Sequence, residues 1–120
     1  MKNLRNVITL VLMTLFSITI YAQSESVVGE WVVGKQNTVI KIAQENEAYT
    51  GKIVSSNNEK AEIGKLMVKD VKQVEGQWKG KVYSPKRKKW YDTTFIPNKK
   101  ELNIELSVGF FNKTITWVEK

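Results

Sequence analysis

Residues 102–108 have the sequence Leu-Asn-Ile-Glu-Leu-Ser-Val, in which large apolar and polar side chains alternate without exception. Successive side chains of a β-strand point to opposite faces, so this period of two predicts a strand with one buried and one solvated side. A helix would need apolar residues three or four positions apart, and no long window of the chain has that spacing. The stretch therefore predicts an antiparallel sheet that covers a core on one face.

The same alternation continues on both sides of this stretch, interrupted by turn-forming residues such as Asn57-Asn58 and Gly109. One segment fits less well: the apolar side chains of residues 63–71 suit a short helix or a strand, and Gly64 with the β-branched residues favours an extended segment. The expected strands are 27–34, 37–43, 47–55, 63–71, 77–84, 90–96, 102–108 and 114–118.

About eight short strands joined by short turns predict one all-β domain over residues 23–120, an antiparallel up-and-down meander. A closed or nearly closed barrel is expected in preference to a sandwich, because closure removes the exposed strand edges. Eight strands leave an interior wide enough for packed side chains or for one small ligand.

The first 22 residues have the pattern of a signal peptide. Lys2 and Arg5 precede fourteen uncharged residues, 7–20, and small Ala22 follows at the expected cleavage site. A membrane anchor is the alternative, but a span needs about 20 apolar residues. We therefore expect an exported protein whose mature chain covers residues 23–120.

The composition excludes several chemistries. The chain has no His and no Cys, which removes imidazole and thiolate metal ligands, Cys–His nucleophile pairs and disulfides. Asp70 and Asp92 are the only aspartates, and the pattern brings no two carboxylates together for glycoside hydrolysis. We expect a protein without enzymatic activity, metal or cofactor.

Ten aromatic residues in the expected mature chain, four of them Trp, allow two interpretations. They either fill the core or line a cavity for an apolar or amphipathic ligand. Gly51 and Gly80 are expected to leave room inside the barrel next to aromatic side chains of their own strands. The candidate ligand-binding residues are Tyr49, Trp78, Tyr83 and Trp90, whereas Trp31 and Trp117 are expected to plug the barrel ends.

Basic residues outnumber acidic ones, 19 to 12, and four of them follow one another in a single turn. This turn predicts either a surface for anionic lipids or glycans or a solvated hairpin that keeps strand ends unpaired. Nucleic acid is not an expected partner, because the protein is expected to be exported and basic and aromatic residues interleave in one turn only. The expected basic rim consists of Lys79, Lys81, Lys86, Arg87, Lys88 and Lys89.

Six short segments, in this order and spacing, resemble the DUF2147 family of small exported bacterial proteins of uncharacterised function: 29–31, 40–42, 49–53, 63–64, 78–85 and 114–117. The resemblance implies a calycin-type, lipocalin-like barrel in the periplasm or secreted from a Gram-negative bacterium, and it brings no established activity. Gly29-x-Trp31 is also similar to the first-strand Gly-x-Trp of lipocalins, in which a basic residue packs on the indole, and a Lys such as Lys113 would have to supply that residue here.

These patterns lead to two hypotheses about function. The first is an exported lipocalin-like barrel that binds a small amphipathic or apolar ligand in its interior. The alternative is a filled barrel that docks on an anionic envelope surface or a partner protein through its basic turn. Ligand identity and oligomeric state are not specified by either hypothesis.

Overall fold

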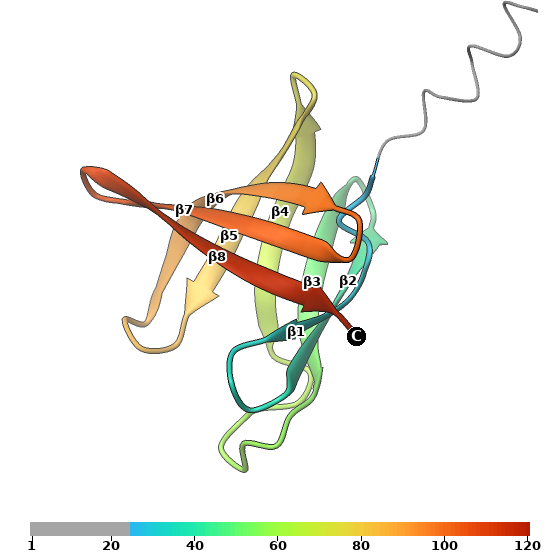
Figure 1. The fold of residues 1–120 in the computed structure, drawn as a ribbon, viewed down its shortest axis with the longest axis vertical. Coiled ribbons are helices and arrows are strands. Elements are labelled where there is room, and N and C mark those ends of the chain that lie inside the picture. Colours follow the sequence, from blue (N-terminus) through green and yellow to red (C-terminus); the bar gives the residue numbers. More distant parts are fainter. Residues whose placement is uncertain (1–24) are drawn as a thin grey trace, which may run out of the picture.

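The computed structural model describes residues 25–120. These residues form eight antiparallel strands, joined in sequence order (Figure 1). Each strand is hydrogen-bonded to the next, and β8 returns to β1. The predicted closed meander is confirmed, whereas the predicted signal peptide, residues 1–22, lies outside the described residues. The strands are β1 (Gly29–Val33), β2 (Thr38–Glu45), β3 (Ala48–Ser55), β4 (Leu66–Val74), β5 (Gln77–Ser84), β6 (Lys89–Asn98), β7 (Glu101–Val108) and β8 (Phe111–Glu119).

Strand β7 shows how the alternating sequence produces the wall of the barrel. Leu102 and Ile104 are completely buried in the core. Asn103 between them faces outward, and its side-chain oxygen accepts a hydrogen bond of 2.9 Å from the Thr116 hydroxyl on β8. The apolar face is thus packed inside while the polar face is satisfied on the surface.

Strand β4 departs from the alternation, which explains why residues 63–71 are ambiguous in the sequence. The neighbours Met67 and Val68 are both buried, and Asp70 has a left-handed backbone with φ of 57°. At Asp70 the register shifts by one residue against both β3 and β5. Such a β-bulge bends the strand and increases its twist, so the irregular segment curves the sheet and still closes the barrel.

Two glycines opposite these irregularities let the strands approach closely. A Cβ atom at Gly80 would lie 2.6 Å from Val71 Cγ2 and 2.9 Å from the backbone oxygen of Lys69. A Cβ atom at Gly51 would lie 2.9 Å from side-chain atoms of Val68. The expectation that these glycines leave room inside is wrong, because neighbouring strands already fill the space.

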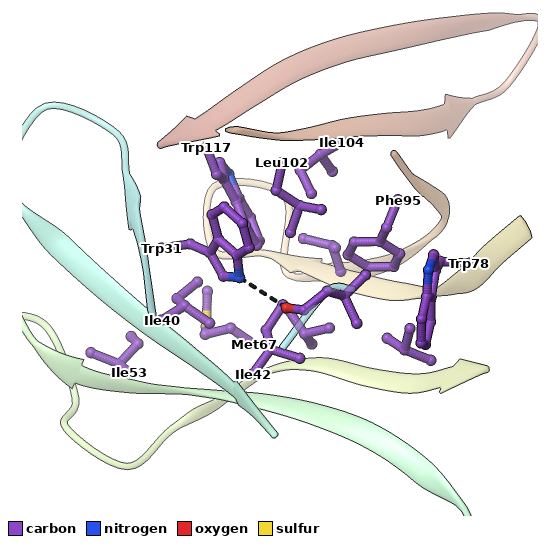
Figure 2. Packing of buried hydrophobic residues seen from close by; sticks show 14 residues of the cluster. Trp31, Ile40, Ile42, Ile53, Met67, Trp78, Phe95, Leu102, Ile104 and Trp117 are labelled. Atoms are coloured by element: carbon purple, nitrogen blue, oxygen red, sulfur yellow. Dashed lines mark hydrogen bonds between the residues drawn. The ribbon is translucent and has the colours of Figure 1, made fainter. Parts of the chain in front are cut away.

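The two ends of the barrel differ. We call the end formed by the β1–β2, β3–β4, β5–β6 and β7–β8 turns the mouth, and the opposite end the closed end. Val27 is completely buried at the closed end. The Trp31 indole N–H donates a hydrogen bond of 2.9 Å to the backbone oxygen of Val27 (Figure 2). Glu25 accepts another, of 2.9 Å, from the backbone N–H of Lys99. The segment before β1 is thereby held across this end.

Trp31 and Trp117, the expected end plugs, lie in one core cluster with Phe95, Leu102 and other buried residues (Figure 2). Trp31 pairs with Glu119, so Trp117 is its diagonal neighbour across the β1–β8 seam. That seam contains only two residue pairs, Trp31 with Glu119 and Val32 with Val118. Residues 111–116 of β8 pair with β7 alone, and the β7–β8 hairpin projects away from β1 (Figure 1).

We predict that Gly80→Ala lowers the free energy of unfolding by about 1–3 kcal/mol, because the added methyl group meets the backbone of the β4 bulge. Chemical denaturation followed by circular dichroism measures this change. Lys79→Ala, at the exposed neighbouring position, is the control and should change stability by under about 0.5 kcal/mol. Equal stability of Gly80→Ala and the wild type would contradict the close approach.

Candidate functional site

A cavity of about 830 Å³ lies behind the mouth and continues into the barrel. Its walls are mainly aliphatic and come from all eight strands. Trp117 contributes to the lining from the half of the barrel nearer the closed end, which we call the closed half. The other large apolar residues of the wall are Val33, Ile40, Ile53, Met67, Val82, Leu106, Val108, Phe111 and Ile115.

The cavity lies in the half of the barrel that holds no buried indole. Trp31, Trp78, Phe95 and Trp117 are buried toward the closed end, whereas the strands carry Val and Ile side chains toward the mouth. Aromatic side chains cover 150–250 Å² each, so four of them fill a narrow barrel where aliphatic ones leave a void. The sequence therefore produces a barrel that is packed at one end and hollow at the other.

Charged groups surround the mouth of this cavity. Lys60, Glu62 and Lys65 come from the β3–β4 loop, Arg87 from the β5–β6 turn and Lys113 from β8. Four cations thus face one carboxylate. The opening is positive, while the wall behind it is apolar.

Two of these cations are held by tyrosines that also line the cavity. Lys65 Nζ lies 4.9 Å from the centroid of the Tyr83 ring. The Arg87 guanidinium donates a long hydrogen bond of 3.5 Å to the Tyr91 hydroxyl. Both contacts limit the rotamers of long basic side chains, so the positive charges are oriented at the opening.

Among the predicted ligand-binding residues, Tyr83 lines the cavity and Trp90 packs on its ring, with the centroids 5.3 Å apart. Trp90 lies two positions before the exposed Asp92 and so shares the outer face of β6. Lys69 Nζ covers the Trp90 ring at 4.3 Å. Trp90 is therefore part of the outer wall beside the mouth.

Tyr49 and Trp78 do not line the cavity. Their rings meet edge to face with centroids 5.1 Å apart, near the β2–β3 and β4–β5 turns of the closed end. The prediction placed them inside because of Gly51 and Gly80, yet these glycines permit strand contact and create no space.

The predicted basic rim is divided among three places. Arg87 lines the cavity, and Lys86, Lys88 and Lys89 are exposed in or beside the same turn. Lys81 forms an ion pair of 3.1 Å with Asp92 on the outer wall. Lys79 lies beside a shallower polar depression of about 420 Å³ over β5–β8.

Lys113, named from the sequence as one lysine that would have to pack on Trp31, lies at the other end of β8. Trp31 pairs with Glu119, six residues or about 20 Å of strand away from Lys113. Lys113 instead pairs with Leu106 and lines the cavity.

Several cavity residues were missed by sequence reasoning, notably Lys60, Lys65, Leu106 and Lys113. In a meander every second turn lies at the same end, so the inward positions next to the first, third, fifth and seventh turns must share one opening. That rule selects Leu106 and Lys65 from the strand boundaries alone.

No helix with the length and apolar character of a membrane span occurs among residues 25–120. Within that range, no three acidic side chains are grouped closely enough to hold a metal ion.

Comparisons with known proteins agree with this architecture. The model of an uncharacterised bacterial protein family, DUF2147, matches residues 29–119. The solved structure of HP1028 from Helicobacter pylori, described as a member of the lipocalin family, superposes with a TM-score of 0.66 at 18% identity. The match covers 81% of this chain and 84% of that protein, and it identifies the barrel as lipocalin-like. A search of curated proteins finds no match.

We predict that Trp78→Leu lowers the free energy of unfolding by about 2 kcal/mol, because it opens a void in the closed half. Trp90→Leu should cost less, about 1 kcal/mol, because Trp90 is only partly buried and loses one cation–π contact. Denaturation curves measure both changes. If Trp78→Leu left stability unchanged, its place in the core would be contradicted.

Proposed function

The chain belongs to the DUF2147 family, and from that premise we propose that it is an exported, non-enzymatic barrel that binds a small amphipathic or apolar ligand behind its mouth. One observation carries the proposal: the cavity of about 830 Å³ with aliphatic walls. Binding pockets for small molecules commonly measure 300–1,000 Å³ and combine an apolar lining with a few placed polar groups.

The distribution of charge around the cavity favours an amphipathic ligand with an anionic group. An apolar chain or ring would lie against Leu106, Val82 and Ile53 in the interior. Its carboxylate, sulfate or phosphate would remain at the mouth near Arg87, whose planar guanidinium binds such groups through two parallel hydrogen bonds. Lys65, which lies over the Tyr83 ring and 3.9 Å from Glu62, and Lys113 would add further positive charge.

Two fluorescent probes that differ by a single sulfonate test this proposal. N-phenyl-1-naphthylamine is neutral, and 1-anilinonaphthalene-8-sulfonate is its anionic counterpart; both emit strongly in apolar surroundings. We expect both to bind the protein. Leu106→Trp should abolish binding because the indole occupies the cavity, whereas Ser107→Trp, on the outer face next to it, should leave binding unchanged. Binding that survives Leu106→Trp at full strength would contradict an interior site.

The same probes measure the role of the basic mouth. Arg87→Ser should weaken binding of the sulfonate about fivefold and that of the neutral amine less than twofold, because only the sulfonate loses a charged partner. Lys99→Ser, at the closed end, is the control with the same change of charge. Equal effects of Arg87→Ser on both probes would show that the mouth does not select for charge.

Native mass spectrometry of the exported protein, purified without detergent, identifies a ligand acquired in the cell. Extra mass of a few hundred daltons that is lost on denaturation would supply the molecule for identification. If neither probe binds and no such mass is found, the binding proposal fails.

A further inference from the structure

The mouth carries the most exposed apolar side chains of the described residues. Among the large hydrophobic residues, the greatest exposures are those of Phe110 (108%), Ile63 (64%) and Phe111 (63%). Phe110 and Phe111 lie at the β7–β8 turn and Ile63 in the β3–β4 loop, so all three belong to the mouth. Folding does not bury them, and exposed large apolar side chains gathered at one end of a barrel are typical of a binding face.

Charge is divided between the two ends of the barrel. At the mouth, the segments 34–37, 56–65, 85–89 and 109–113 contain eight basic and two acidic residues. At the closed end, the segments 25–28, 45–48, 74–77, 98–101 and 119–120 contain six acidic and three basic residues. The barrel is therefore a dipole whose positive end is the mouth, and a negative surface attracts this end and repels the other.

From these two observations we infer that the mouth docks on an anionic lipid bilayer, with Phe110 and Ile63 entering the headgroup region. Each basic side chain near an anionic bilayer contributes about fivefold in affinity, and apolar side chains that enter the interface add to it. A polysaccharide would satisfy the positive charge but offers no apolar phase for Phe110, so a bilayer matches both properties of this surface.

Docking in this orientation also places the cavity opening against the lipid. A ligand with an apolar tail would pass between bilayer and barrel without crossing water, a consequence that rests on the proposed function. Docking itself does not depend on it, because Phe110 and Ile63 lie outside the cavity lining. Vesicle binding and probe binding can therefore fail independently.

The absence of Cys from the chain permits a direct test with a single labelled site. Phe110→Cys and, as the control at the closed end, Val74→Cys are labelled with the environment-sensitive fluorophore NBD. Vesicles contain phosphatidylcholine alone or phosphatidylcholine with 30% phosphatidylglycerol. We expect a severalfold rise of emission at position 110 with the anionic vesicles only, and no change at position 74. No rise at position 110, or equal rises at both positions, would overturn the inference.

Flotation of the unlabelled exported protein with the same vesicles separates the two contributions. We expect Phe110→Ser combined with Ile63→Ser, and separately the replacement of all four residues 86–89 by Ser, each to lower the vesicle partition coefficient at least tenfold. The matched control, Lys99→Ser with Lys100→Ser at the closed end, should change it less than twofold. Sodium chloride at 0.5 M should weaken wild-type binding.

Two controls apply to every variant. Mass spectrometry must show that all variants begin at the same residue, and circular dichroism must show that each is folded. Differences between them then report on the mouth alone. If the wild-type protein does not bind anionic vesicles, the inference is wrong. Retention on the anionic polysaccharide alginate without vesicle binding would also overturn it and would assign the mouth to a glycan.

Discussion

The burial of Trp31 and Trp117, one on each side of the β1–β8 seam, is the constraint on which the barrel depends. Only two residue pairs join these strands, so hydrogen bonds alone give the first and last strands little hold on each other. The two indoles, with Val27 beneath Trp31, add buried area where the ladder is short. Because this packing occupies the closed half, the open half can remain hollow without loss of closure.

Much of the fold could be predicted from the sequence, because a period of two specifies both the strand and its buried face. It succeeds for β7, where Leu102 and Ile104 are buried as the alternation requires. It fails for β4, where the bulge at Asp70 displaces the pattern by one residue, and such a bulge has no period of its own. The alternation of inward and outward side chains holds only while each residue pairs with one on the neighbouring strand, so the extra residue of a bulge interrupts it.

The site was less predictable, for a different physical reason. Alternation indicates which side chains point inward, but not how far the opposite wall stands from them. Trp78 points inward as predicted, yet Tyr49 meets its ring and leaves no cavity there. Leu106 also points inward, but it lines the cavity, because the buried indoles lie nearer the other end of the barrel. Distance across the barrel is set by the strand twist and bulges, which the pattern does not encode.

A chain without Cys gains no stability from disulfides, so the packed half must supply it. Substitutions in that half, such as those at Trp78 or Gly80, act on closure itself. The mouth contributes less, since Lys60, Arg87 and Phe110 bury little of their surface. Selection can therefore vary the charge and apolar character of the mouth at small cost to stability, because the two tasks fall on opposite ends of the same eight strands.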